Sequence, residues 1–423
     1  MKKYKTQDVF GISRDVPMNY VERIQVDNVL KNSLAQKKHI TIFGSSKQGK
    51  TCLRKHCLSE SEYIIVQCSN KWTLSDLNSN ILKRAGFEIT QSTKTATSGK
   101  AKILASIKAK LGLGEGSAGF EIENTDTTEK VTQELELDSD DVNDIISALK
   151  SIEFRKYIVL EDFHYLKTDV QRDFAIELKA FHENSPLCFI VIGVWLDENR
   201  LVMYNGDLTG RLIQINADKW DKEELKQVIK NGEQLLNVKF NDTFVEELVS
   251  NSFENVYIVQ EACYQICEDA EIRETQSNII NVGEGIDTRE LVKRIINIQS
   301  ARYNAFILHY AAGFQTTTLE MHKWILYPII ISQVSELSKG LTYRKIKECI
   351  QSKHPRGTEL NPGNLTQALQ SSASLQLSKN ILPIIIDYDE TNLKLHIVDK
   401  GFLIWLEYQN RDELFEMAEL EIG

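Results

Sequence analysis

The feature that most limits what this chain can fold into is a glycine-rich loop between an apolar run and a helical stretch. Residues 39–43, HITIF, are a short run of β-favouring residues, typical of a buried strand. The next residues fit the pattern G-x-x-x-x-G-K-[ST] at every fixed position: Gly44, Ser45, Ser46, Lys47, Gln48, Gly49, Lys50 and Thr51. The residues after them, TCLRKHCL, continue as a predicted helix. A strand–loop–helix unit is therefore expected here.

This loop is suited to hold the phosphates of a nucleotide. Glycines let the backbone close around a phosphate, and the N–H groups of the loop and of the next helix offer it positive potential. We expect Lys50 to reach the β- and γ-phosphates and Thr51 to hold Mg²⁺ through its hydroxyl. Cys52, directly behind the loop, is counted with the nucleotide-binding positions, and its side chain is expected to pack within the helix.

A pair of carboxylates roughly 110 residues further on is the expected second half of the site. In YIVLED, residues 157–162, an apolar strand ends at Glu161 and Asp162. The carboxyl ends of parallel strands are where ligands bind in such sheets. By position, Glu161 supports Mg²⁺ and Asp162 polarises the attacking water. The alternative is that both carboxylates cap the next helix.

Further apolar runs alternate with helical patterns along the first half of the chain. Strands are predicted at residues 63–69, 186–195 and 211–215, besides those at 39–43 and 156–166. Strands that alternate with helices favour an α/β fold with a parallel sheet and right-handed crossovers. We therefore predict an α/β fold class in which a P-loop parallel β-sheet core precedes a helical lid and a C-terminal winged helix-turn-helix.

Changes of pattern divide the chain into five predicted parts. They are an N-terminal arm (1–19), the nucleotide-binding core (20–217) with an insertion at about 87–137, a helical lid (218–274), a linker and long helix (275–324), and a winged helix (325–423). Within the insertion, Ile103, Leu104, Ile107 and Leu111 have helical spacing. That predicted helix could pack on its own protein or contact a partner.

The C-terminal part has the order of a winged helix. Three helices are expected in WILYPIIISQVSEL, TYRKIKECIQSK and NPGNLTQALQSSASLQ, and two strand-like stretches joined by DETN follow them. The third helix, which would read DNA, contains no Arg or Lys. Basic residues precede it: Arg344, Lys345, Lys347, Lys353 and Arg356. DNA contact through this stripe, a protein-facing role and a plain solvated face all stay open.

These motifs resemble the AAA+ and STAND superfamily of P-loop ATPases, with the closest likeness to the group of origin initiators and STAND-type regulators. YVERIQVDNVL resembles the helix that precedes the loop in that family, and Arg23 falls at its arginine. The resemblance implies that Arg23 lies near the adenine, which favours ATP, and that the cofactors are ATP and Mg²⁺. It covers roughly residues 20–270, and most of the chain once the winged helix is included.

The resemblance also implies an oligomer. NGDLTGRLIQI matches the place where related ATPases carry an arginine before the fifth strand, so Arg211 is the candidate arginine finger for a neighbouring subunit. A surface salt bridge is the alternative role for Arg211. The helical stretch from residue 220 to 266 is similar to the lid of that family.

Three departures from the family pattern concern hydrolysis. The family order of Asp then Glu is reversed in YIVLED, the end of the fourth strand reads IGVWL without a Ser, Thr or Asn, and the lid helix ENVYIVQEA lacks an arginine. The last two losses suit slow hydrolysis and a protein that holds nucleotide as a conformational switch.

Composition limits the other possibilities. The net charge of −10 predicts no global attraction to nucleic acid or to anionic membranes. Cys263 and Cys267 lie one helical turn apart without a matching His or Cys pair, which favours core packing over metal binding. The longest apolar stretch is too short to span a bilayer and the N-terminus does not resemble a signal peptide, so a cytoplasmic protein without membrane contact is expected.

Three hypotheses follow for the function. The first is an ATP-binding, slowly hydrolysing regulatory ATPase that forms a nucleotide-dependent homo-oligomer, acts in bacterial anti-phage defence and works through an effector protein on a separate chain. The second is a DNA-binding ATPase of the replication-initiator or transposition-regulator kind. The third is a structural adaptor whose nucleotide is never turned over.

Overall fold

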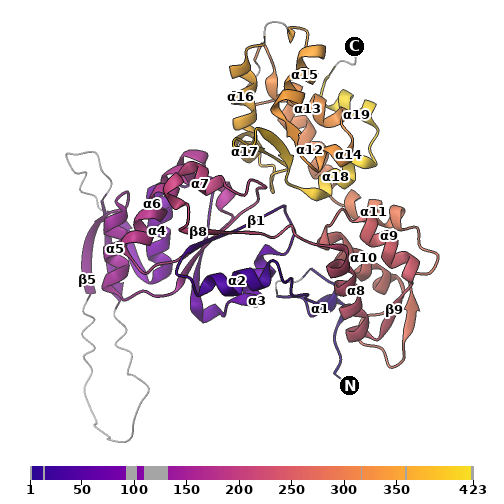
Figure 1. Ribbon diagram of the computed structural model, residues 1–423, viewed down its shortest axis with the longest axis horizontal. Helices are drawn as coiled ribbons and strands as arrows, with labels where there is room; N and C mark the ends of the chain where they lie inside the picture. Colours follow the sequence, from indigo (N-terminus) through magenta and orange to yellow (C-terminus); the bar gives the residue numbers. More distant parts are fainter. Residues whose placement is uncertain are drawn as a thin grey trace, which may run out of the picture.

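The structure is a computed structural model of the chain that describes residues 2–12, 15–91, 102–108, 132–315, 317–357 and 360–420. Figure 1 shows an α/β core on one side, a small helical unit on the other, and a mostly helical C-terminal unit that lies over both. Leu111 and most of the predicted insertion fall outside the described residues.

The centre of the core is a five-stranded sheet in which every neighbouring pair is parallel, in the order β2-β6-β7-β1-β8. The strands are β1 (His39–Phe43), β2 (Tyr63–Gln67), β6 (Tyr157–Glu161), β7 (Phe189–Ile192) and β8 (Leu212–Asn216). Covered on both faces, such strands are near-continuous apolar runs, which is why the sequence pattern found them. The parallel α/β core is therefore confirmed, and the carboxyl ends of all five strands share one edge.

Helices cover both faces of this sheet. They are α2 (Asp27–Leu34), α3 (Lys50–Cys57), α4 (Leu74–Ala85), α5 (Val142–Ser151), α6 (Thr168–Asn184) and α7 (Arg200–Tyr204), with short 3₁₀ turns η1 (Glu60–Glu62), η2 (Phe163–Tyr165) and η3 (Gly206–Leu208). Side chains of α2 and α3 pack with one set of strand residues, and those of α4, α5 and α6 with another. The sheet is thus the middle of three layers.

The predicted helix in the insertion is wrong. Residues of this segment form β4 (Lys102–Lys108), which pairs antiparallel with β3 (Phe87–Gln91) and β5 (Thr132–Asp138) in a separate sheet. Ile103 and Ala105 are buried while Leu104 is only half-buried. This alternation has the period of two residues that a strand requires, and Ile103 and Ile107 lie four apart, a spacing that fits both periods.

The lid region forms its own helical unit. It contains α8 (Lys222–Leu236), α9 (Asp242–Asn251) and α10 (Val256–Asp269), with a parallel strand pair of β9 (Val238–Phe240) and β10 (Ile280–Val282). Strand β10 comes from the stretch predicted as a linker, so part of that linker is pinned to the lid. The N-terminal helix α1 (Thr6–Val9) packs against α8 and α10.

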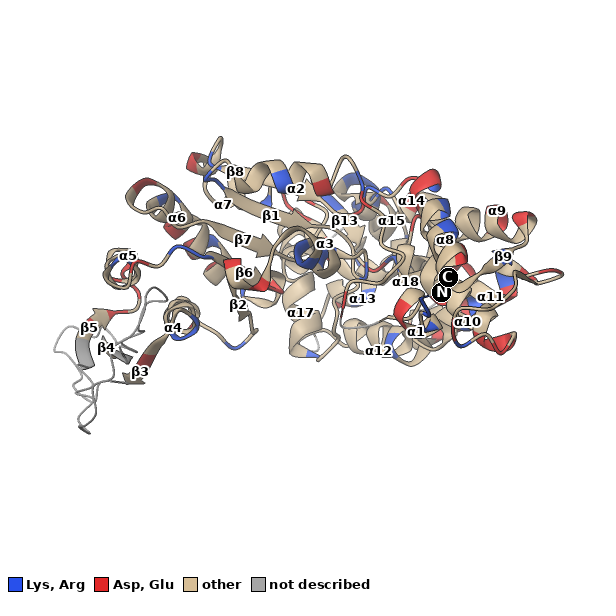
Figure 2. Ribbon diagram, turned by 90° about the horizontal axis from the view of Figure 1, so that it is seen from below, with Lys and Arg blue, Asp and Glu red and all other residues tan. Residues whose placement is uncertain are grey.

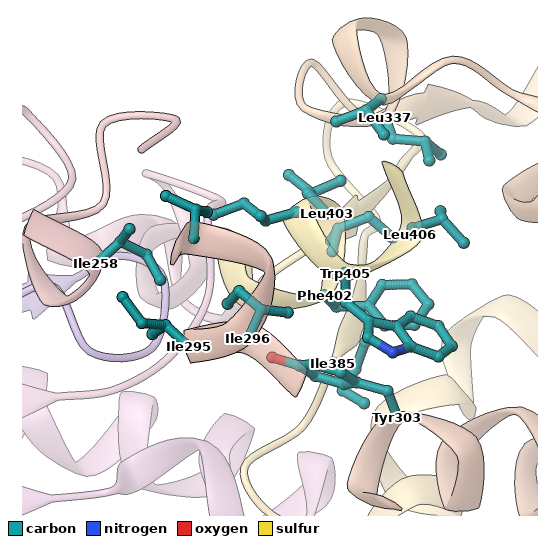
Figure 3. Close-up of a cluster of buried hydrophobic side chains, with 14 of the residues drawn as sticks. Ile258, Ile295, Ile296, Tyr303, Leu337, Ile385, Phe402, Leu403, Trp405 and Leu406 are labelled. Atoms are coloured by element: carbon teal, nitrogen blue, oxygen red, sulfur yellow. The ribbon is translucent and has the colours of Figure 1, made fainter. Parts of the chain in front are cut away.

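The long helix predicted within residues 275–324 is two helices, α11 (Thr288–Asn297) and α12 (Ser300–Ala311). Both join the lid to the C-terminal unit rather than separating them. Figure 3 shows the buried cluster at this junction, with side chains from α10, α11, α12 and α18 (Lys400–Glu407): Ile258, Ile295, Ile296, Tyr303, Phe402, Leu403, Trp405 and Leu406. The lid and the C-terminal unit therefore share one hydrophobic core.

The rest of the C-terminal unit is mostly helical. It contains α13 (Met321–Ile331), α14 (Val334–Leu337), α15 (Tyr343–Lys353), α16 (Pro362–Gln370), α17 (Ser372–Ser378) and α19 (Arg411–Met417), with strands β11 (Leu341–Thr342), β12 (Ile386–Asp389) and β13 (Lys394–Ile397). The first and third helices predicted here are each split in two, into α13 with α14 and α16 with α17. The predicted strand pair is present as an antiparallel hairpin. No helix among the described residues has the length and apolarity that crossing a bilayer requires.

Candidate functional site

The glycine-rich loop leaves β1 at the carboxyl edge of the sheet. Gly44 has φ +142° and Gly49 has φ +80°, conformations that L side chains rarely adopt. Gly49 forms the N-cap of α3, so the loop ends at a helix N-terminus. A Cβ built on Gly49 meets no heavy atom within 4 Å, whereas one built on Gly44 lies 2.6 Å from Asp218. The loop thus has an open side at Gly49 and a tightly packed side at Gly44.

Lys50 lies inside the curve of this loop. Its Nζ donates to the carbonyl oxygens of Gly44 at 3.0 Å and Ser45 at 2.5 Å. Burial lowers the pKa of Lys50 to about 8, although Asp218, Asp162 and Glu161 act in the opposite direction. A buried cation held only by neutral carbonyls is suited to bind an anion at this place.

Two amides of the loop are already hydrogen-bonded by other parts of the protein. The Ser45 N–H donates to Oδ1 of Asp218 at 2.7 Å, and the Ser45 hydroxyl donates to Oδ2 of the same carboxylate. The Ser46 N–H donates to the carbonyl oxygen of Val398 at 3.0 Å. Asp218 follows β8, and Val398 belongs to the C-terminal unit. Groups that would face phosphate are therefore engaged by the protein itself.

The lid also contacts the loop. Nζ of Lys47 lies 4.0 Å from the ring centroid of Tyr257 on α10, a cation–π distance. Burial lowers the pKa of Lys47, against the charges of Asp399 and Glu261. The side chain of Gln48 is buried, and neither of its polar atoms has a partner in the described part of the chain. Core, lid and C-terminal unit thus all meet at this one loop.

The predicted carboxylate pair follows β6 at the same edge of the sheet. Oε1 of Glu161 accepts a hydrogen bond from Nε of Arg54 at 2.9 Å, and both side chains are buried. Figure 2 shows α3 with its Lys and Arg positions in blue, and acidic positions in red at β6. Burial raises the pKa of Glu161, and the Arg54 charge opposes that shift. Glu161 therefore ties the helix after the loop to the strand that carries the acids.

Asp162 occupies the second position and is less enclosed. Its backbone has φ +55°, and its carboxylate accepts a hydrogen bond from Nε2 of Gln67 at the end of β2. Burial raises the pKa of Asp162, while the Lys50 charge and the Gln67 hydrogen bond lower it. Asp162 is thus within electrostatic range of Lys50.

The residues present fit a nucleotide with Mg²⁺. Thr51 is exposed in the first turn of α3, where its hydroxyl is accessible to a metal ion. The described residues contain no ready-made group of three or more His, Cys, Asp or Glu ligands. Mg²⁺ keeps several waters and takes other ligands from substrate phosphates, so it needs only one or two protein groups. The roles of Thr51 and Glu161 as Mg²⁺ ligands remain predictions from the sequence.

Comparison with known proteins gives the fold. No protein-family model matches the sequence, and no curated protein matches it. Among solved structures, the Walker-type ATPase PABY2304 of Pyrococcus abyssi is similar over 94% of this chain and 99% of its own, with 14% identity and a TM-score of 0.50.

The chain has the fold of a Walker-type ATPase.

Two further structures are less similar. The alignment with the Orc1 protein of Aeropyrum pernix in complex with DNA covers 98% of this chain and 97% of the Orc1 chain, with 11% identity and a TM-score of 0.43. The alignment with the RuvB Holliday junction branch migration motor of Thermotoga maritima covers 94% of this chain and 95% of the RuvB chain, with 13% identity and a TM-score of 0.35. The similarity to the Pyrococcus abyssi structure confirms the P-loop fold implied by the sequence resemblance, at the level of the Walker-type fold.

Arg23 and Cys52 lie beside the loop of this Walker-type fold. Arg23 is buried, donates to the carbonyl of Ala217 at 2.7 Å, and has its guanidinium 4.1 Å from the ring centroid of Trp220. The indole N–H of Trp220 in turn donates to the carbonyl of Gln48. Arg23 thus supports the segment that packs on the loop. Cys52 is half-buried in α3, and burial raises the pKa of its thiol.

Arg211 lies on the far side of the Walker-type core. It directly precedes β8, at the amino-end edge of the sheet, and its carbonyl accepts from the N–H of His39 at the start of β1. Its guanidinium bonds Glu183 at 2.8 Å and the carbonyl of Asp207. The fold therefore does not bring Arg211 to the loop of its own chain. This placement matches the salt-bridge alternative and leaves the finger role to a second copy.

Several site residues escaped the sequence interpretation. Asp218 and Arg54 bind the loop and the acid pair, and Gln67 bonds Asp162. Arg54 lies one helical turn after Lys50, and that spacing was the available signal. His164 lies two residues beyond Asp162 and is buried beside the end of β7. Its backbone position could be expected from the sequence EDFH, but its partners could not.

Proposed function

We propose that this protein is a nucleotide-dependent switch: an ATPase that binds ATP with Mg²⁺ at Gly44–Thr51 and hydrolyses it slowly. The observation that carries the proposal is the convergence of three units on one loop. Ser46 is bonded by Val398, Lys47 is covered by Tyr257, and Ser45 is bonded by Asp218. Phosphate binding at these amides competes with those contacts, so nucleotide occupancy and domain arrangement are coupled.

In this proposal each predicted residue keeps its role. Lys50 binds the β- and γ-phosphates, Thr51 with Glu161 supports Mg²⁺, and Asp162 polarises the water. Arg211 acts in trans in a homo-oligomer, after release from Glu183. The finer assignment to the AAA+ and STAND group, the place in anti-phage defence, and the effector on a separate chain belong to the same proposal.

The test is nucleotide binding measured by calorimetry with ATP and Mg²⁺. Lys50→Ala removes the buried cation that bonds the loop carbonyls and is expected to weaken ATP binding on the order of 10- to 100-fold, because a charged hydrogen bond to phosphate is lost. Asp162→Asn is expected to keep ATP binding and to lose hydrolysis, since an amide cannot accept the proton.

Lys55→Ala is the matched control, because this lysine lies on the same helix α3 beyond the loop. It should bind ATP as the parent does. If Lys50→Ala binds ATP with unchanged affinity, the loop is not the nucleotide site and the proposal fails.

The alternative, a DNA-binding ATPase, rests on the inferred winged helix of α13, α15, α16 and the hairpin. Two of its basic side chains already face carboxylates of the same unit: Arg344 bonds Glu348 at 2.8 Å, and Lys345 bonds Glu336. Part of the expected DNA-reading segment, α17, packs against the core. The switch is therefore favoured, and DNA binding that weakens steeply with salt would revive the alternative.

A further inference from the structure

Two buried histidines hold the two ends of β7 in the same way. The N–H of Phe189, at the start of this strand, donates to Nδ1 of His39 at 3.1 Å. The N–H of Val194, just past its end, donates to Nδ1 of His164 at 3.2 Å. In each ring the other nitrogen, Nε2, is left to find its own partner. The chain thus contains a natural comparison between two similar groups.

The two rings differ at Nε2. Nε2 of His39 bonds the carbonyl oxygen of Leu178 at 2.8 Å, so this ring is fully satisfied. Nε2 of His164 is buried and meets no hydrogen-bond partner among the described residues. The side chain of His164 is 3% exposed, so bulk water does not replace the missing partner. A buried polar group left unpaired costs about 1–3 kcal/mol, and such groups often mark a site of function.

The unpaired nitrogen of His164 is a donor. Because Nδ1 accepts the Val194 N–H, its lone pair is used there, and the proton of the neutral ring is on Nε2. Burial, with smaller effects from the Lys50 and Arg200 charges, lowers the pKa of His164 well below its ordinary value, so the ring is neutral. What is missing at Nε2 is therefore an acceptor, and the nearby cations favour an anionic one.

The position in the sheet identifies that acceptor. Strand β7 lies between β6, which delivers Glu161 and Asp162, and β1, which delivers the phosphate loop. His164 sits on η2, directly after the acid pair, and is fixed to the end of β7. In the sequence this end, IGVWL, offers no polar side chain. A terminal phosphate bound by Lys50 would therefore lie near the carboxyl end of β7, between the ends of β6 and β1.

We propose that Nε2–H of His164 donates to an oxygen of the terminal γ-phosphate of bound nucleoside triphosphate. From the turn that follows the neighbouring strand β6, His164 then supplies the polar contact that the end of β7 lacks. The proposal rests on the proposed function, since it presumes a nucleotide at the loop. It adds that the protein distinguishes triphosphate from diphosphate through this ring.

The experiment compares binding of a non-hydrolysable ATP analogue and of ADP, each with Mg²⁺, by calorimetry. His164→Ala is expected to weaken the analogue about tenfold, the loss of one good hydrogen bond to a charged group, and to leave ADP affinity within twofold. His164→Gln, which keeps an N–H donor, should recover part of the preference for triphosphate.

His39→Ala is the matched control. It removes another buried imidazole, which bonds the opposite end of β7 at the opposite edge of the sheet. It should therefore lower the melting temperature while the ratio of triphosphate to diphosphate affinity stays that of the parent. The proposal would be overturned if His164→Ala left the ratio of triphosphate to diphosphate affinity unchanged, or weakened the binding of both nucleotides equally. His164 would then only hold the end of β7 in place.

A measurement on the unaltered protein covers variants that do not fold. With ¹⁵N-labelled histidine, the Nε2–H resonance of His164, assigned by its loss in His164→Gln or from the backbone, should shift with the triphosphate analogue and much less with ADP. Equal shifts with both would overturn the proposal. If the parent binds neither nucleotide, the proposed function itself fails, an outcome distinct from loss of the triphosphate preference.

Discussion

Glu177 on α6 is a carboxyl group that the fold keeps protonated at neutral pH. It is 6% exposed, and its oxygens accept hydrogen bonds from Nδ2 of Asn78 at 3.0 and 3.2 Å. Burial raises its pKa from 4.5 to about 8, although the Asn78 hydrogen bonds act in the other direction. Above pH 4.5 the unfolded chain loses this proton while the folded chain retains it. Stability of the core should therefore fall from about pH 4.5 to pH 8 and then level off.

Glu177→Gln mimics the protonated form and should remove this pH dependence. The amide keeps an acceptor for Asn78 and offers a donor to Oδ1 of Asn78, which is buried without a partner in the described chain. At about pH 8 we expect the core to be more stable by on the order of 1–3 kcal/mol, with little change at about pH 5. Thermal unfolding at both pH values measures this. Glu416→Gln, on an exposed face of α19, is the control. Equal melting temperatures of Glu177→Gln and the parent at the higher pH would contradict the prediction.

At the same residue scale, the sequence predicts groups whose chemistry is local and misses those whose partners are distant. The positions Gly44–Thr51 could be named because one stretch of backbone makes the loop. The partners Asp218 and Arg54 could not, because their bonds to Ser45 and Glu161 join residues 173 and 107 positions apart. Only packing of the whole core decides such contacts.

At the scale of elements, apolar runs between helices predicted the five strands of the parallel sheet, since both faces of each strand are covered. The spacing of apolar residues gave the wrong element where a short segment fitted both the helix and the strand period, as in β4. It also failed between α11 and α12, because residues 297–300, Asn-Ile-Gln-Ser, contain neither Gly nor Pro to mark the break. Residues 280–282 form a strand because they pair with β9. Such tertiary pairing cannot be predicted from a local sequence pattern.

Gly232 in α8 leaves room for the side chain of Phe10 in the N-terminal arm. A Cβ built there lies 2.0 Å from Cζ of Phe10, whose ring is fully buried. Thr6 holds the arm by donating from Oγ1 to the carbonyl of Ile272 at 2.7 Å. Gly232→Ala gains up to about 1 kcal/mol in helix propensity. Overpacking against this buried ring costs about 1–3 kcal/mol, so net destabilisation is expected.

A double-mutant cycle measured by chemical unfolding separates the two effects. In a Phe10→Ala background the clash is absent, and Gly232→Ala should be neutral or stabilising. The same cost of Gly232→Ala in both backgrounds would show that the arm does not require this glycine.

At the scale of the whole molecule, the joint between the core and the C-terminal unit is weaker than the joint between the lid and that unit. The lid shares a large hydrophobic cluster with the C-terminal helices, whereas the core meets them through a small one around Val194, Leu377, Ile384 and Val398. A buried ion pair of Arg200 on α7 with Asp387 on β12 also lies in this joint. The lid and C-terminal unit are therefore expected to move together, away from the core.

Breaking the Arg200–Asp387 pair should open that joint. Asp387→Ala leaves Arg200 buried without its partner, which costs about 3–5 kcal/mol unless the joint separates and the guanidinium is hydrated. Separation removes the Val398 carbonyl from the Ser46 N–H. We therefore expect a larger radius of gyration by small-angle scattering, faster hydrogen exchange at Ser46, and several-fold tighter nucleotide binding, because phosphate no longer competes with the C-terminal unit.

Arg172→Ala provides the control in the same joint. Its pair with Glu390 is exposed, with side-chain exposures of 50% and 38%, and such pairs contribute about 0–1 kcal/mol. It should change neither the scattering nor the affinity. Asp387→Ala with a lower melting temperature but an unchanged radius and unchanged nucleotide affinity would contradict the switch, because the joint would then be a fixed scaffold. An opened joint with unchanged affinity would instead remove only the competition at Ser46, and the coupling would have to pass through Lys47 and the lid.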